Sequence, residues 1–131
     1  MRRARSMEDV AGDRILVVDD DDNIRQIVQL CLSGEGYRVE EAANGEMALE
    51  MLHDFDPELI LLDLRMPVMD GWEFARRYRT LPGPHAPIVA FVAALNVQEE
   101  CGDLQSAAIV SKPFDLDDLL AAVRAQLPQV Y

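Results

Sequence analysis

The sequence is poor in basic residues, in cysteine and in long apolar runs, and each shortage excludes a class of protein. With 12 Lys and Arg against 24 Asp and Glu the net charge is −12, so the field around the protein repels the phosphates of nucleic acids and anionic membranes. Two cysteines form neither a disulfide framework nor a CxxC pair, which suits a reducing compartment. No apolar run reaches the roughly 18 to 20 residues of a membrane span. We therefore expect a cytoplasmic protein that binds neither nucleic acid nor membrane directly.

The length and the apolar content fit one globular domain. The 131 residues are 50% apolar, and a domain of this size buries about two thirds of its unfolded surface, enough for a core without disulfides or structural metal. Residues 1–12 mix arginines with acidic residues and offer little to bury, so they are predicted to be a disordered lead-in. The folded domain is predicted over residues 13–128.

From residue 14 onward, short apolar runs alternate with segments of helical periodicity. Strands are predicted at 15–18, 37–42, 59–62, 88–93 and 108–110. The first helix is predicted to run from a cap at Asp22 or Asn23 to an exit marked by Gly34 and Gly36, and the others at 46–55, 72–78, 97–104 and 116–127. Strands alternating with helices favour an α/β fold with a parallel sheet covered on both faces.

Acidic side chains and one lysine fall at the carboxyl ends of these strands. Asp19 and Asp20 follow the first strand, Asp63 ends the third, and Lys112 ends the fifth. Parallel sheets carry their sites outside this edge, and converging carboxylates need a cation to offset their repulsion. Because Mg²⁺ prefers oxygen ligands, Asp20 and Asp63 are predicted to bind it directly and Asp19 directly or through water, with the backbone carbonyl of Arg65 completing the set.

Taken singly, these residues also suit ordinary structural roles. An acidic loop after a strand can be a solvated loop with a helix cap, and a lone lysine is most often surface charge. Their joint placement favours a site in which a bound cation lets the Asp63 carboxylate attack a phosphoryl group. Lys112 would then contact a phosphoryl oxygen.

Three segments resemble the signatures of the receiver domain of bacterial two-component response regulators, the CheY-like domain. They are ILVVDDD at 15–21, LILLDLRMPVMDG at 59–71 and SKPF at 111–114, and the likeness spans residues 13–128. The resemblance implies a flavodoxin-like fold with strand order 2-1-3-4-5. It also implies that Asp63 is the phosphoacceptor, that Asp19 and Asp20 are the acidic Mg²⁺ pair, and that Lys112 contacts the phosphoryl group.

Two positions depart from the pattern of that family. Receiver domains usually carry Thr or Ser at the end of strand four, but this chain has Val92, which cannot donate a hydrogen bond, followed by the small Ala93 beside the phosphoryl site. On strand five, Ile109 stands where the family often has an aromatic residue. A hydrogen bond to a charged group contributes about 1.5 to 3 kcal/mol, as much as many switching equilibria. We therefore expect phosphorylation to persist but the conformational response to be weak or differently wired.

The leading functional hypothesis is a stand-alone receiver. Asp63 would accept a phosphoryl group, with Mg²⁺ as cofactor, from a sensor histidine kinase or a histidine phosphotransfer protein, and the monomer or weak dimer would signal through an unknown downstream protein. The alternative is a pseudo-receiver that binds partners independently of phosphate. The chain is expected not to be an enzyme, beyond self-phosphorylation from small donors and autodephosphorylation. A flavodoxin is disfavoured by four aspartates after the first strand, and an aspartyl phosphatase by the arginine at position 65.

Overall fold

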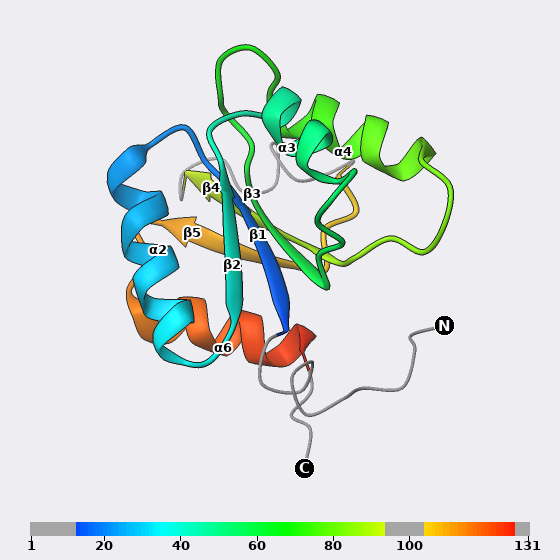
Figure 1. Ribbon diagram of the computed structural model, residues 1–131. Helices are drawn as coiled ribbons and strands as arrows, with labels where there is room; N and C mark the ends of the chain where they lie inside the picture. The colour runs from blue at the N-terminus through cyan, green and yellow to red at the C-terminus, as the bar shows by residue number, and fades with distance from the viewer. Residues whose placement is uncertain (1–12, 94–103, 128–131) are drawn as a thin grey trace.

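The computed structural model describes residues 13–93 and 104–127, where helices cover both faces of a parallel sheet. The strands are β1 (Arg14–Val18), β2 (Arg38–Ala42), β3 (Leu59–Asp63), β4 (Ile88–Ala93) and β5 (Ala108–Lys112). The helices described are α2 (Asp22–Gly34), α3 (Gly45–Met51), α4 (Gly71–Thr80) and α6 (Leu116–Gln126). The strand order is β2-β1-β3-β4-β5 with parallel neighbours throughout, so the flavodoxin-like order that the resemblance implied is confirmed (Figure 1).

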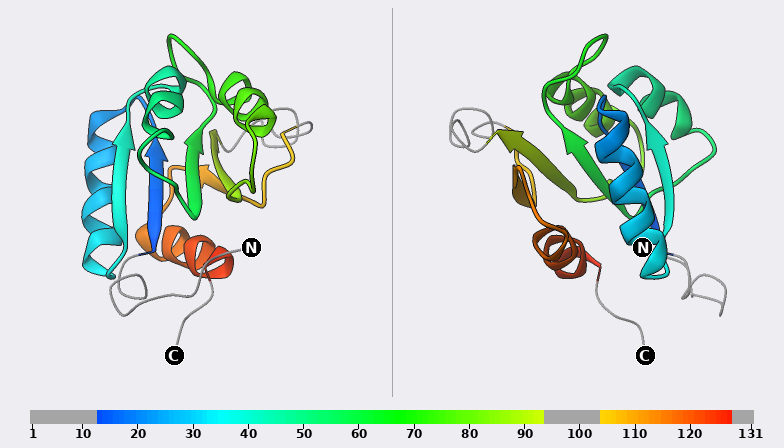
Figure 2. Two further views of the ribbon diagram at one scale, coloured as in Figure 1. Left: turned by 45° about the vertical axis from the view of Figure 1, so that its right-hand side comes forward. Right: turned by 90° about the vertical axis from the view of Figure 1, so that its left-hand side faces the viewer.

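Two apolar cores lie on opposite faces of this sheet. Helices α2 and α6 cover one face, and α3 and α4 cover the other (Figures 1 and 2). Strand β1 shows the division, because Leu16 and Val18 pack on the side of α3 and α4, whereas Ile15 and Val17 pack on the side of α2 and α6. Successive side chains of a strand point to opposite faces, so a strand buried on both faces is apolar without interruption. The continuous apolar runs of the sequence follow from this two-sided burial.

The ends of α2 differ by one or two residues from the prediction. Its N-cap is Asp21 rather than Asp22 or Asn23, because the Asp21 carboxylate accepts hydrogen bonds from the backbone N–H groups of Asn23 and Ile24, at 2.9 and 3.2 Å. After the helix, the Tyr37 N–H donates to the Leu32 carbonyl at 3.1 Å. Tyr37 therefore belongs to the end of α2, and β2 begins at Arg38 rather than at residue 37.

Helix α3 ends at Met51, four residues before the predicted end at Phe55. The N–H groups of Asp54 and Phe55 both donate to the Met51 carbonyl, at 3.1 and 2.8 Å, and so close the helix in a turn. Leu52 and Phe55 nevertheless pack against the core, so the apolar periodicity continues past the last helical residue. The apolar pattern of the sequence therefore does not show that α3 ends at Met51.

The other elements lie within a few residues of their predicted bounds, and β5 extends to Lys112 instead of ending at residue 110. The predicted lead-in at 1–12 and the predicted helix at 97–104, apart from Leu104, lie outside the described residues. Within residues 13–93 and 104–127, no helix has the length and apolar character needed to cross a membrane.

Candidate functional site

Carboxylates from β1 and β3 meet a lysine from β5 at the carboxyl edge of the sheet. Strands β1 and β3 are neighbours, and one oxygen each of Asp19, Asp20 and Asp63 lies within 4.8 Å of the others. The Lys112 Nζ reaches across β4 to donate to Asp19 Oδ2 at 2.8 Å, and lies 3.5 Å from Asp63 Oδ2. The convergence predicted from the strand ends is confirmed.

Burial makes this cluster electrostatically costly. Asp19 is fully buried and Asp63 is 7% exposed, whereas Asp20 is exposed. Burial and the neighbouring charge of Asp19 raise the pKa of Asp63 to about 7, although Lys112 and the Arg65 backbone N–H act in the opposite direction. Burial lowers the pKa of Lys112, but the hydrogen bond and the charge of Asp19, together with Asp63, raise it more. One lysine therefore does not fully compensate two buried carboxylates.

The donor set fits a hard divalent cation such as Mg²⁺. Three carboxylate oxygens within 4.8 Å of one another are ligands of the kind that Mg²⁺ takes, and a divalent charge would offset the repulsion that raises the pKa of Asp63. Asp19 already uses Oδ1 to accept the backbone N–H of Asp21 at 2.9 Å and Oδ2 to accept Lys112, which orients it within the cluster. The role of the Arg65 carbonyl as a further ligand stays a prediction.

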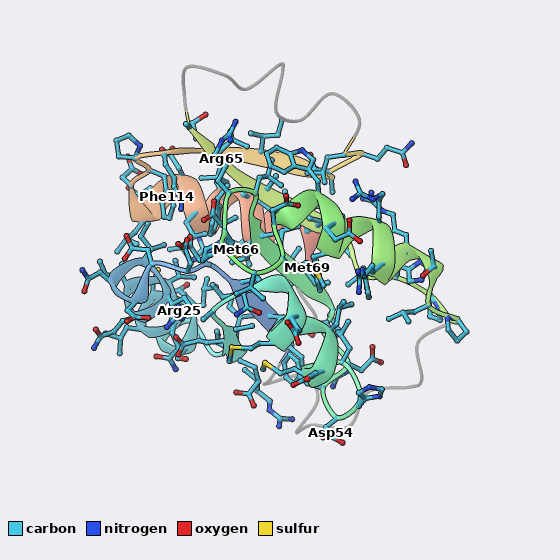
Figure 3. All side chains as sticks on the ribbon, turned by 90° about the horizontal axis from the view of Figure 1, so that it is seen from above. Arg25, Asp54, Arg65, Met66, Met69 and Phe114 are labelled. Atoms are coloured by element: carbon cyan, nitrogen blue, oxygen red, sulfur yellow. The ribbon has the colours of Figure 1, made fainter. Side chains whose placement is uncertain are left out.

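An open cavity of about 780 Å³ adjoins the cluster. Its wall brings together five residues selected from the sequence, namely Asp63, Arg65, Val92, Ala93 and Lys112. The rest of the lining was not selected as site residues and comes from α2, from β4 and from the segment after β5: Ile24, Ile27, Val28, Phe91, Pro113, Phe114, Asp115 and Leu116. The apolar residues of α2 and β4 resemble ordinary core in the sequence, and only Pro113 and Phe114 belong to a recognised segment, SKPF. Figure 3 looks from above and shows Arg65 on the loop after β3, with Phe114 towards α2.

The two atypical positions lie in different surroundings. Val92 is 2% exposed, packs in the core on the side of α3 and α4, and is among the residues that line the cavity, where its side chain has no hydroxyl to donate a hydrogen bond. Ile109 is 42% exposed on the edge strand β5, opposite Ala90 of β4, and does not line the cavity. The absence of a hydroxyl at Val92 therefore concerns the lining of the cavity, whereas Ile109 lies outside that lining. Their effect on signalling stays a prediction.

Gly71 fixes the start of α4 against the strand that carries Asp63. A Cβ atom built on Gly71 would lie 2.6 Å from the Asp63 carbonyl oxygen and 2.8 Å from Leu64 Cα. The Gly71 N–H donates to the Leu64 carbonyl at 2.9 Å, and Asp70 caps the helix by accepting the N–H of Glu73. The loop between β3 and α4 thus returns to within van der Waals contact of the site.

Gly71→Ala is expected to destabilise the protein by about 2 to 3 kcal/mol, because the backbone of β3 must shift to admit the methyl group. The matched control is Gly34→Ala at the end of α2, where nothing lies within 4 Å of an added Cβ, so the change is expected to be neutral or stabilising by about 0.5 kcal/mol. Urea unfolding of both variants measures the contrast. Equal free energies of unfolding for the two variants would show that β3 and α4 can move apart to admit the methyl group without destabilising the protein.

Comparison with known proteins agrees with this geometry. Residues 15–124 match the response regulator receiver domain family. Response regulator MprA of Mycobacterium ulcerans is 42% identical over 116 residues, which cover 87% of this chain and 50% of that protein. The chain thus spans about half the length of the curated relatives it matches.

Solved structures are similar over nearly their whole length. Response regulator TrrA from Thermotoga maritima, in complex with Mg²⁺–BeF, has a TM-score of 0.77 and 34% identity, covering 88% of this chain and 99% of that one. Chemotaxis response regulator CheY4 of Vibrio cholerae has a TM-score of 0.79 and 32% identity, covering 87% of this chain and 98% of that one. With the fold, the acidic cluster and the lysine in place, these matches mean that the chain belongs to the response regulator receiver domains of two-component signal transduction.

Proposed function

We propose that Asp63 accepts a phosphoryl group from a sensor histidine kinase or a histidine phosphotransfer protein. The observation that carries the proposal is the position of the Asp63 carboxylate, which lies beside Asp19 and Asp20 and 3.5 Å from the Lys112 Nζ, at the wall of an open cavity. The Mg²⁺ complex of TrrA, a relative with 34% identity, supports Mg²⁺ as the cofactor.

In the proposed reaction an Asp63 oxygen attacks the phosphorus of a phosphohistidine. The new bond is between this oxygen and phosphorus, and the bond between phosphorus and the histidine nitrogen breaks, so the electron pair leaves with the imidazole. Lys112 binds a phosphoryl oxygen, and the backbone N–H of Arg65 orients the carboxylate. Asp19, Asp20 and Asp63 would hold Mg²⁺, which would supply positive charge to offset the repulsion between the carboxylate and the phosphoryl group.

Incubation with acetyl phosphate and Mg²⁺ is expected to add one phosphoryl group to the wild-type protein, measured by intact mass. The gain should be absent in Asp63→Asn and in EDTA, because the first lacks the nucleophile and the second the compensating charge. Asp54→Asn is the matched control, since Asp54 lies in the turn after α3, away from the cluster, and this variant should gain mass as the wild type does. A gain that survives in Asp63→Asn would place the phosphoacceptor elsewhere.

The alternative is a pseudo-receiver whose contacts do not depend on phosphate. The lack of a hydroxyl at Val92, a residue of the cavity lining, favours it, since a phosphoryl group on Asp63 would then find no hydroxyl there to bind. An unmodified wild-type protein, under conditions in which a control receiver is modified, would select this alternative over phosphotransfer.

Val92→Thr is expected to enlarge the conformational response to phosphorylation. The new hydroxyl would donate to a phosphoryl oxygen and couple β4 to the site, a contact of about 1.5 to 3 kcal/mol. Backbone amide chemical shifts of β4 and β5, recorded before and after adding beryllofluoride and Mg²⁺, measure the response. If the wild type already shifts these strands as far as the residues around Asp63, the missing hydroxyl has no consequence.

The remaining parts of the proposal concern the setting of the protein. We expect a cytoplasmic signalling domain that acts through a downstream protein, as a monomer or weak dimer, without direct contact to nucleic acid. Its chemistry is limited to its own modification, by self-phosphorylation from small donors and autodephosphorylation, so it has no turnover on other substrates.

A further inference from the structure

The residues that line the cavity include a second cationic residue besides Lys112. Arg65 lines the same cavity as Asp63, and its guanidinium carbon lies 5.6 Å from the centre of the Trp72 ring in a cation–π arrangement. In Figure 3, Arg65 lies on the β5 side of the loop after β3, whereas Met66 and Met69 lie nearer α3. A phosphoryl group on Asp63 would therefore enter a cavity whose lining includes Arg65.

The loop that joins β3 to α4 holds Arg65 and Trp72 at a set separation. At one end, the Arg65 N–H donates to Asp63 Oδ1 at 3.4 Å. At the other end, Trp72 is the second residue of α4, and Gly71 before it packs directly on the backbone of β3. Both residues are therefore anchored to the strand that carries the phosphoacceptor.

Stacking and hydrogen bonding use different parts of a guanidinium. The flat face lies on an aromatic ring, whereas the N–H groups donate in the plane of the fork, a geometry that suits phosphate oxygens. One arginine can make both interactions at once. The ring also removes conformational freedom from a long side chain, so less of that freedom is lost when the phosphoryl group arrives.

We propose that Arg65 is a second cationic contact for the phosphoryl group on Asp63, and that Trp72 is a positioning residue that holds the guanidinium at the cavity. This contact would compensate in part for the hydrogen-bond donor that the chain lacks at Val92, a residue of the cavity lining without a hydroxyl. This inference rests on the proposed phosphorylation of Asp63.

The test uses beryllofluoride as the phosphoryl probe, with saturating Mg²⁺, and reads bound probe by ¹⁹F NMR. Arg65→Gln is expected to weaken probe binding by about twofold to fivefold, the effect of an ion pair at a partly exposed site. Trp72→Leu should weaken it in the same direction, and Trp72→Phe, which keeps a ring, should bind nearly as the wild type does. In the Arg65→Gln background, Trp72→Leu should have no further effect, because the tryptophan acts through the arginine.

Two controls separate this role from a general one. Arg124→Gln removes the same charge from the far end of α6, where Arg124 pairs with Glu35, and should leave probe binding unchanged. Mg²⁺ binding without the probe, measured by calorimetry, should be equal or tighter in Arg65→Gln, because a positive charge has been removed. A variant that had lost the structure of the site would instead bind both the probe and Mg²⁺ more weakly than the wild type does.

Each outcome decides the question. Wild-type affinity for the probe in Arg65→Gln, or an undiminished effect of Trp72→Leu in the Arg65→Gln background, overturns the inference while leaving the mass gain on Asp63, and so the proposed function, intact. No mass gain with acetyl phosphate in the wild type removes the proposed function, and the inference with it.

Discussion

Replacing Asp63 with asparagine is expected to stabilise the metal-free protein at alkaline pH. In the wild type, burial and the charge of Asp19 raise the pKa of Asp63 from 3.8 to about 7. The folded protein therefore keeps a proton on Asp63 that the unfolded chain releases, and stability falls as the pH rises from about 4 through 7. Asparagine cannot ionise, so the stability of the variant does not fall over this pH range on account of residue 63.

The expected size of the effect follows from the two pKa values. Between pH 5 and pH 8, the loss due to Asp63 amounts to about 2 to 3 kcal/mol, at about 1.4 kcal/mol per pKa unit. Urea unfolding of wild type and Asp63→Asn in EDTA at both pH values measures it as a growing difference in the free energy of unfolding. Mg²⁺ at pH 8 should stabilise the wild type more than the variant, because the cation offsets the ionised carboxylate. Parallel pH profiles in EDTA would mean that Asp63 ionises as an ordinary aspartate.

Lys112→Met is expected to destabilise the metal-free protein by about 2 to 4 kcal/mol, although methionine keeps most of the apolar length of the side chain. Asp19 is fully buried, and Lys112 is the cation that pairs with it at 2.8 Å. Removing one partner of a buried pair leaves the other charge uncompensated, which costs far more than breaking a surface pair. Thermal and urea unfolding in EDTA measure the loss.

The matched comparison is Arg124→Met, which breaks the pair with Glu35 between two half-exposed side chains and should cost less than about 1 kcal/mol. Mg²⁺ should restore part of the stability of Lys112→Met, because a divalent cation brings positive charge back to Asp19. If Lys112→Met proves as stable as Arg124→Met, the buried carboxylate is neutral in the folded state and the pair contributes little.

The sequence predicts best the features that depend on local pattern. The apolar runs of β1, β3 and β4 mark strands buried on both faces, and the acidic residues at the carboxyl ends of β1 and β3 mark the edge of the sheet. Given parallel strands, Asp19 and Asp63 lie at the same edge, and they meet because β1 and β3 are neighbours. Spacing alone does not give the strand order, which came from the resemblance to receiver domains.

Features that depend on contacts between elements could not be predicted. The start of β2 was misplaced because Tyr37 looks like a strand residue but uses its N–H to close α2. The apolar wall of the cavity, including Phe91, reads as ordinary core until the distances are known. The stack of Arg65 on Trp72 depends on how the loop after β3 returns to the sheet, which no spacing in the sequence records.

The pair between Asp19 and Lys112 joins residues 93 positions apart in the chain. During synthesis, β3 leaves the ribosome before β5 exists, so the emerging chain carries Asp19 and Asp63 without the lysine that pairs with Asp19. The buried pair can form only once β5 has added to the edge of the sheet, so Asp19 has no counter-charge from Lys112 until then.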